Sequence, residues 1–518
     1  MSITFPGFCG PSYQLSNQWA TIERSVNWMP VSNESRTDTA KGTSFLEPSP
    51  GNAPFGPLPV PAGLQGPCRG LLEYRGLGFG VNGPNVFKFT SRGAMTRLGD
   101  ILDDNQPVSM VANANGQIGI ASAGKLFVIQ LPAGNVIPVV DPNFLGASFL
   151  TFQDGYLIAL TPNSNQFQIS GTDAIPLGDM TQWDAANISI QAGQADLLAA
   201  LLSSREYLRL LGTRRSQIYQ NVGSQGIGGF PFQSYNETFI ETGIGAPMSL
   251  VDMGESMIWV GEDARGQRAC WRDVAFQPQR ISDYGVEWQW QRYQKISDAV
   301  AFPFIWQGHL LYQITFPSAF IPNGPQSATW IYDQTESNLR GRACWHERQF
   351  LLPGNQLGGR PEHFHAFVGG VHVVGSSGSD GNPGALYQYS PTNYGDCAQV
   401  NGVQVTQPVV RDRICPVLWH NDNRLVINRL RMQFNKGMGL DGGVLGSMPE
   451  IMVRVSRDGG ATYGPELHVS AGQIGEYGLI TYLNRLGYSR QFVIWVRCSD
   501  PVLWSVVNAE LDIVELPG

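Results

Sequence analysis

A recurring strand-turn-strand pattern most restricts the folds open to this 518-residue chain. Seven times between residues 68 and 389, a short apolar strand is followed by a turn and a second strand. The first strands centre on Val81, Ile120, Ile158, Leu208, Trp259, Leu311 and Val373, at steps of 39, 38, 50, 51, 52 and 62 residues. Propeller blades repeat about every 40 to 50 residues and must stack to bury their faces. The pattern predicts a seven-bladed β-propeller over residues 67–404.

The composition also favours an all-β fold. The chain has 61 Gly and 34 Pro, and only 15% of its residues are charged. Glycine and proline disfavour helices and suit short strands joined by tight turns. Residues 195–202 resemble a helix, and the inner strand of a blade is an equally good interpretation.

The two ends of the chain differ from the repeats. Residues 424–434, 450–455 and 491–497 are longer strands with strict alternation, which predicts an antiparallel β-sandwich-like domain over residues 405–518. Residues 1–66 are rich in Pro and Gly, which predicts an extended arm. The arm is either a disordered tail or a segment that clasps a neighbouring subunit, and we expect it to be ordered only in an assembly. Its apolar residues favour the clasp: Phe5, Phe8, Trp19, Val26 and Trp28.

The net charge of −8 argues against tight binding of nucleic acid through a broad basic surface. Arg214 and Arg215 form a basic doublet that a solvated hairpin turn explains better than a phosphate site. An acidic wall is still compatible with a DNA conduit, because repulsion lets DNA slide.

The seven cysteines are odd in number, widely dispersed and without a CxxC pair. We therefore expect buried free thiols, consistent with assembly in a reducing cytoplasm. The first residues lack the basic and apolar regions of a signal peptide, and no apolar run approaches about 18 residues. No membrane insertion is predicted.

The best local motif is Ser456-Arg-Asp458-Gly-Gly460-Ala-Thr-Tyr463, which matches the Asp box of sialidases with Tyr463 in place of Trp. The Asp458 carboxylate is expected to bond turn amides, while the glycines take positive φ and the aromatic ring packs beneath. A sialidase also needs several boxes, three arginines and a Tyr/Glu pair. We therefore interpret Ser456, Asp458, Gly460 and Tyr463 as a structural turn.

Other candidate sites are weaker. His363 and His365 share one face of a strand with His372 nearby, but a polar strand face explains them better than a metal site. The tryptophans could form a carbohydrate platform, although their alternation within strands favours core packing. No catalytic, cofactor-binding or metal-binding residues are predicted, and no cofactor is expected.

Several short elements, read in order, resemble the tail hub proteins of short-tailed bacteriophages, the packaged-DNA stabilisation protein family. These elements are 26–31, 258–266, 280–282, 308–309, 330–333, 345–348, 456–460, 475–477, 485–487 and 499–501 with Trp504. Each element is short, and their order over residues 20–515 carries the resemblance.

The resemblance implies a hub or nozzle in the virion tail, assembled in the host bacterial cytoplasm. Its partners would be copies of itself in a hexameric ring, the portal or head-to-tail adaptor, tail fibres or spikes, and a tail needle or plug. The ring would complete the head, retain packaged DNA and form part of the conduit for genomic DNA. The alternative hypotheses are a β-propeller glycosidase or carbohydrate-binding module, and a generic propeller scaffold.

Overall fold

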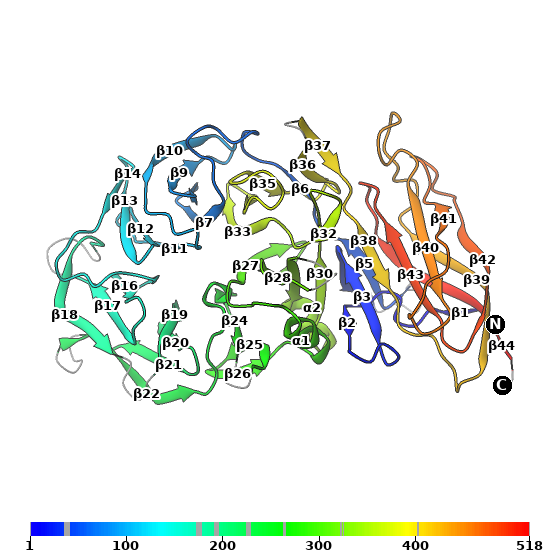
Figure 1. The fold of residues 1–518 in the computed structure, drawn as a ribbon, viewed down its shortest axis with the longest axis horizontal. Helices are drawn as coiled ribbons and strands as arrows, with labels where there is room; N and C mark the ends of the chain where they lie inside the picture. The colour runs from blue at the N-terminus through cyan, green and yellow to red at the C-terminus, as the bar shows by residue number, and fades with distance from the viewer. Residues whose placement is uncertain are drawn as a thin grey trace.

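The protein is all-β, with a ring of sheets beside a two-sheet sandwich (Figure 1). The computed structural model describes residues 2–35, 42–171, 179–190, 196–223, 229–262, 266–321, 324, 326–400 and 403–516. In this part of the chain no helix is both long and apolar enough to cross a membrane.

The ring consists of four-stranded antiparallel units, and the first five follow one another along the chain. Their strands are β7 (Cys68–Tyr74), β8 (Leu77–Asn82), β9 (Asn85–Phe89) and β10 (Met95–Asp100); β11 (Ser109–Ala112), β12 (Gln117–Ser122), β13 (Lys125–Gln130) and β14 (Asn135–Pro138); β15 (Phe149–Gln153), β16 (Tyr156–Leu160), β17 (Gln166–Ser170) and β18 (Trp183–Ile190); β19 (Leu198–Ser204), β20 (Tyr207–Gly212), β21 (Ser216–Asn221) and β22 (Phe232–Ile240); β23 (Val251–Asp252), β24 (Met257–Glu262), β25 (Arg268–Val274) and β26 (Gln277–Arg280).

Two further units complete the ring. One contains β27 (Val300–Trp306), β28 (His309–Phe316), β29 (Ala328–Asp333) and β30 (Trp345–Arg348). The other contains β33 (Glu362–Val368), β34 (Val371–Ser376) and β35 (Leu386–Tyr389), and its fourth strand is β6 (Asn52–Pro54) from the N-terminal region. The ring is therefore closed by a strand that precedes it in the sequence.

Each of the seven predicted hairpins forms the middle two strands of one of these units. These strands are buried on both faces, because neighbouring units cover them. In β13, for example, four consecutive apolar residues are buried between an exposed Lys125 and an exposed Gln130. Alternation is therefore weak in the middle strands, and the spacing of the turns carries the pattern.

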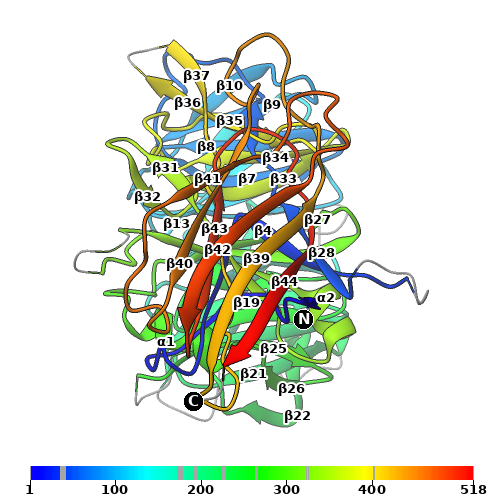
Figure 2. The same ribbon diagram turned by 90° about the vertical axis from the view of Figure 1, so that its right-hand side faces the viewer.

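The sandwich consists of two sheets that enclose one core (Figure 2). One sheet runs β4 (Trp28–Ser32), β5 (Ser44–Pro48), β44 (Val506–Leu516), β39 (Arg424–Phe434) and β42 (Thr481–Ser489), with β1 (Ser2–Thr4) on β44. The other contains β38 (Arg411–Ile414), β43 (Val493–Cys498), β40 (Glu450–Ser456) and β41 (Leu467–Ser470). The three predicted long strands are confirmed as β39, β40 and most of β43.

The prediction of an extended arm over residues 1–66 requires a correction. Strand β1 pairs with β44, β2 (Tyr13–Gln14) pairs with β3 (Ile22–Val26), and β3 lies between β30 and β38. Phe5, Phe8, Val26 and Trp28 are buried, whereas Trp19 is exposed. The apolar residues of this segment are thus buried within their own chain.

Strand β3 also joins the two domains. It pairs in parallel with β30 through Val26 and Glu347, and antiparallel with β38 at residues 24–26. One ten-stranded sheet therefore runs from the sixth ring unit into the sandwich.

Helices are few in the described residues. They are α1 (Tyr284–Gln291), α2 (Gln334–Arg340) and the 3-10 turn η3 (Pro247–Ser249). The helical interpretation of residues 195–202 is wrong where it can be compared, since β19 covers Leu198–Ser204 and residue 195 lies outside the described residues. Two small hairpins complete the fold: β31 (Phe350–Leu352) with β32 (Gln356–Gly358), and β36 (Asp396–Val400) with β37 (Val403–Gln407).

Candidate functional site

A fully buried charged cluster lies where β6 closes the ring. Arg360 donates to Glu362 at 3.0 and 2.8 Å and to Asp396 at 2.6 and 2.9 Å, and all three side chains are inaccessible to solvent. Asn52 of β6 joins the cluster, because its amide nitrogen donates to Glu362 at 2.8 Å and its backbone nitrogen donates to Asp396 at 3.0 Å. The cluster thus ties the N-terminal strand to the last unit of the ring.

The cations around the cluster favour the ionised form of Glu362. Burial alone would raise the pKa of Glu362, but the positive charges of Arg360 and Arg348 outweigh burial and hold this pKa below its ordinary value. Removal of Arg360 would leave both buried carboxylates without the cation that bonds them directly.

A second buried arginine anchors the first residues of the chain to the sandwich. Arg413, on β38, donates to the carbonyl oxygens of Gly7, Phe8 and Gly10 at 2.6, 2.7 and 3.0 Å, and to the Glu23 carboxylate at 2.9 Å. A guanidinium has five N–H donors, so one side chain can satisfy several carbonyls of an irregular segment. The N-terminal segment is held by such contacts in place of a long strand.

The Asp-box turn follows β40. Asp458 accepts from the Thr462 backbone nitrogen at 2.9 Å and from the Thr462 hydroxyl at 2.5 Å, and the Ser456 hydroxyl donates to it at 2.6 Å. These hydrogen bonds hold the pKa of Asp458 at about 2. Gly460 has a φ of 98°, and a Cβ there would lie 2.6 Å from Ile22. The Tyr463 ring packs edge-on against Trp495 at 5.4 Å.

Replacing Asp458 by Ala is expected to lower the free energy of unfolding by about 1 to 2 kcal/mol, because three turn hydrogen bonds are lost. Thermal and denaturant melting of the purified variant measures the change. Ser379→Ala, which changes an exposed turn hydroxyl, serves as the control. A loss of sugar-cleaving activity at unchanged melting temperature would contradict the structural interpretation.

Two of the three candidate histidines, His365 and His372, form a pair. His365 Nε2 lies 3.0 Å from His372 Nδ1, and both rings pack against the Phe304 ring. Burial lowers the pKa of His365 to about 3 and that of His363 to about 4, which favours the neutral rings. In the described part of the chain, no group of three or more His, Cys, Asp or Glu side chains is arranged to hold a metal ion.

The cysteines and most of the predicted core tryptophans are buried. All seven cysteines are free thiols, and burial raises the pKa of Cys9, Cys68, Cys415 and Cys498 to about 12. Such thiols are poor nucleophiles at neutral pH. The buried tryptophans are Trp259, Trp290, Trp306, Trp330 and Trp345, so core packing explains these five.

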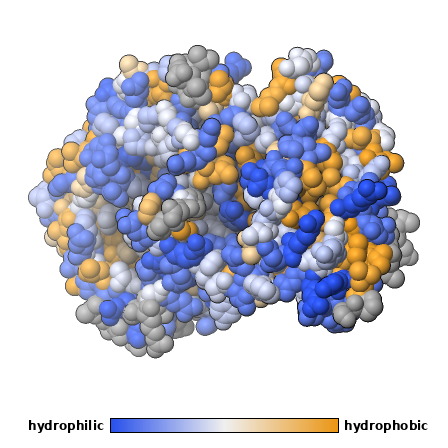
Figure 3. Space-filling view, turned by 45° about the vertical axis from the view of Figure 1, so that its right-hand side comes forward, coloured by the Kyte–Doolittle hydropathy of each residue, from blue (hydrophilic) through white to orange (hydrophobic). Residues whose placement is uncertain are grey.

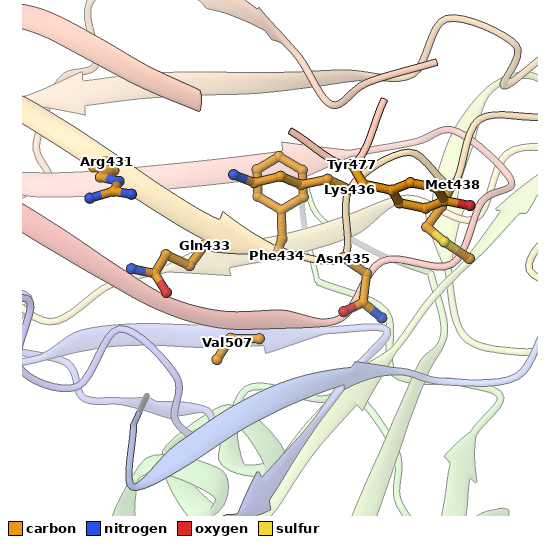
Figure 4. Close-up of a pocket in the computed structure, with 8 residues that line it drawn as sticks. All are labelled: Arg431, Gln433, Phe434, Asn435, Lys436, Met438, Tyr477 and Val507. Carbon is orange, nitrogen blue, oxygen red and sulfur yellow. The ribbon is translucent and has the colours of Figure 1, made fainter. Parts of the chain in front are cut away.

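An open pocket of about 640 Å³ lies at one end of β39 (Figure 4). Arg431 and Gln433 come from β39, Lys436 and Met438 from the following loop, and Tyr477 from the loop before β42. The Lys436 ammonium donates to the carbonyl of Leu479, which ties the two loops together. Polar and basic side chains thus converge beside an exposed tyrosine, of which 71% is accessible.

Arg431 and Gln433 of the pocket also lie on the exposed face of the β42–β39–β44 sheet, which we call the outer face. Figure 2 shows these three strands side by side. Across β39 and β42, Arg431 lies opposite Tyr482, Arg429 opposite Asn484, and Val426 opposite Tyr488. The alternating residues of β39 point into the core instead: Leu425, Ile427, Leu430, Met432 and Phe434. In Figure 3, strongly hydrophilic and hydrophobic residues lie side by side on the half of the molecule formed by the sandwich.

Three features were not found in the sequence analysis above. They are the buried charged cluster of Arg360, Glu362 and Asp396, the contacts of Arg413 with the first residues of the chain, and the outer face of the sandwich. Arg360 and Glu362 are two residues apart, but Asp396 and Asn52 join them only in the folded chain, where β36 lies beside β6. The outer face had a readable signal, since arginines alternate with apolar residues along β39. The pairing of β39 with β42, which brings the tyrosines of β42 beside these arginines, could not be predicted from the sequence.

Comparisons with known proteins match both domains. The family model described as the β-propeller of bacteriophage P22 Gp10 matches residues 22–388, and the model described as its β-sandwich matches residues 411–514. No curated protein matches the chain.

Among solved structures, the chain is similar to several proteins at low identity and low TM-score. A streptogramin B lyase is 11% identical over 65% of this chain and 97% of that chain, with a TM-score of 0.41. The WD40 domain of Neurospora crassa Pan2 is 9% identical over 66% of this chain and 94% of that chain (TM-score 0.38). The WD40 propeller of Doa1 is 10% identical over 66% of this chain and 97% of that chain (TM-score 0.38). These likenesses say nothing about function.

The two family models match in the order of the two domains, and the first alone spans more than half of the chain. The family resemblance found in the sequence motifs is thereby confirmed. The protein belongs to the bacteriophage P22 Gp10 family of phage structural, head-stabilising proteins.

Proposed function

We propose that this chain is a subunit of the virion tail hub or nozzle. In this proposal it forms a hexameric ring below the portal or head-to-tail adaptor, completes the head and retains packaged DNA. The ring forms part of the ejection conduit and anchors tail fibres or spikes and a needle or plug. The observation that carries the proposal is that both domains match one phage structural family, in order.

The proposed role is mechanical and not enzymatic. The Asp-box carboxylate, the best local candidate for chemistry, already accepts three hydrogen bonds within its own turn. The shared ten-stranded sheet couples the ring to the sandwich, which suits a subunit that transmits load between neighbours.

The test is a phage in which the gene for this chain is inactivated. Particles are expected to package DNA and then lose it, because the outlet of the head stays open. Electron microscopy should show empty heads without complete tails, and supplying the gene in trans should restore full heads. DNA-filled particles with intact tails in its absence would overturn the proposal.

We also expect the protein to bind duplex DNA weakly, with a Kd roughly micromolar or poorer at physiological salt. The chain carries 42 acidic against 34 basic side chains, and a conduit must let DNA slide. A filter-binding titration of the purified protein measures the affinity. Nanomolar binding would instead indicate a DNA clamp.

A further inference from the structure

The outer face of the sandwich combines exposed aromatic rings with cations. The exposed fractions of Tyr477, Tyr482 and Tyr488 are 71%, 46% and 65%. Tyr482 and Tyr488 are six residues apart on β42, on either side of the irregularity at Arg485, whose φ is 58°. The Arg429 guanidinium lies 5.3 Å from the centre of the Tyr482 ring.

The cations of this face are only partly paired with carboxylates. Among the described residues, Arg424 and Arg429 form no ion pair with a carboxylate, and the contact of Arg431 with Glu510 is long, at 3.6 Å. Arg429 donates to the side-chain oxygen of Asn484 at 3.2 Å, which holds its planar group against the sheet. Only the Nε of Arg429 is engaged with Asn484, so Arg424 and Arg429 keep N–H donors that could bind an anionic group.

We propose that the outer face of the sandwich binds an acidic polysaccharide. Exposed tyrosine rings offer flat apolar surfaces for the C–H faces of sugar rings, with a hydroxyl at the edge. Arginine pairs with a carboxylate or phosphate through two parallel N–H bonds. The amides of Asn484 and Gln433 add donors and acceptors for sugar hydroxyls. The 640 Å³ pocket at the end of the face is large enough to take a terminal unit of the chain.

The charge distribution favours a sparsely charged, hydroxyl-rich chain over duplex DNA. Glu510 and Asp512 lie on β44, opposite Arg431 and Arg429 across the strand pair. Carboxylates so close to the cations repel duplex DNA, which carries one phosphate charge per about 1.7 Å of its axis. A glycan carries more widely spaced charges and many hydroxyl groups, so the mixed face fits a glycan better. This inference does not depend on the proposed tail function.

The experiment is a calorimetric titration of the full-length protein with polygalacturonate, in parallel with neutral dextran and duplex DNA. We expect salt-sensitive binding of polygalacturonate and no binding of dextran. Arg429→Ala and Tyr482→Ala should each weaken that binding at least 10-fold, with no change in melting temperature, because both side chains are exposed.

The control is Tyr284→Ala on α1. Tyr284 is 65% exposed and carries the Arg280 guanidinium 4.3 Å from its ring centre, so it matches the Tyr482–Arg429 pair at a distant place. The Tyr284→Ala variant should bind polygalacturonate with the same affinity as the unmodified protein. The proposal is overturned if polygalacturonate does not bind, if the two variants bind it normally, or if DNA binds more tightly. It also fails if either variant changes the oligomeric state in sedimentation, which would make the face a contact between copies.

Discussion

A fragment containing only residues 405–518 is expected not to fold. The sandwich core includes Phe5, Phe8, Trp28 and Leu46 from the N-terminal region, and the Trp28 indole donates to the Trp504 carbonyl at 3.0 Å. Loss of one such side chain costs about 2 to 5 kcal/mol, and a whole domain is stable by only about 5 to 15 kcal/mol. Circular dichroism and thermal melting of the fragment should show no cooperative transition.

The matched control joins residues 1–50 to residues 405–518 through a flexible Gly/Ser linker. This fusion restores β1, β3, β4 and β5 and is expected to recover a cooperative transition. If the isolated fragment melts cooperatively, the N-terminal strands are dispensable for the sandwich, and a separate arm would again be the better description.

Replacing Arg360 by Met is expected to lower the free energy of unfolding by about 3 to 5 kcal/mol at neutral pH. The substitution removes four hydrogen bonds and leaves the fully buried carboxyl groups of Glu362 and Asp396 without the guanidinium that bonds both of them. Denaturant melting measures the loss. Arg92→Met is the control, because Arg92 is exposed and should change stability by less than about 0.5 kcal/mol.

The difference in the free energy of unfolding between the unmodified protein and the Arg360→Met variant should become smaller at acidic pH. The folded protein holds the pKa of Glu362 below its ordinary value, so the stabilisation is present above the unfolded pKa, about 4.3. It is lost as the pH falls through the lower folded pKa, where the carboxyl becomes protonated. Melting curves of both proteins between pH 7 and pH 3 should therefore converge. A constant difference would show that the ion pair is not the cause.

The ring was predictable because its signal is local. Each hairpin combines two apolar strands with a turn, and several turns contain residues suited to positive φ, such as Asn163 and Gly124. Helix α2 also had a readable signal, since Asp333 caps its first turn and Gly341 ends it in the left-handed conformation. This helix was not predicted from the sequence.

The contributions of the N-terminal region could not be predicted, because they depend on partners far away in the sequence. Strand β6 has only three residues, Asn-Ala-Pro, and no periodicity. Proline and glycine around it indicate an irregular segment, which is correct locally. Asn52 of β6 is held by Asp396 and Glu362, which lie 344 and 310 residues away. The first residues of the chain are held by Arg413, which bonds Phe8 and Glu23 from about 400 residues away. The proline content of residues 1–66 therefore suggested an extended arm, whereas strands β3 and β6 of this segment pair with strands of the ring and the sandwich.

The closure of the ring by β6 sets an order of events during synthesis. Pro54 and its partner Gln388 are 334 residues apart, so at about 5 to 20 residues per second β6 emerges roughly 20 to 60 s before the strand it pairs with. Throughout that interval the growing ring has an open edge that could pair with another nascent chain. Delayed translation between these two points should therefore increase aggregation, and a chaperone that shields β-strand edges would have its greatest effect in this period.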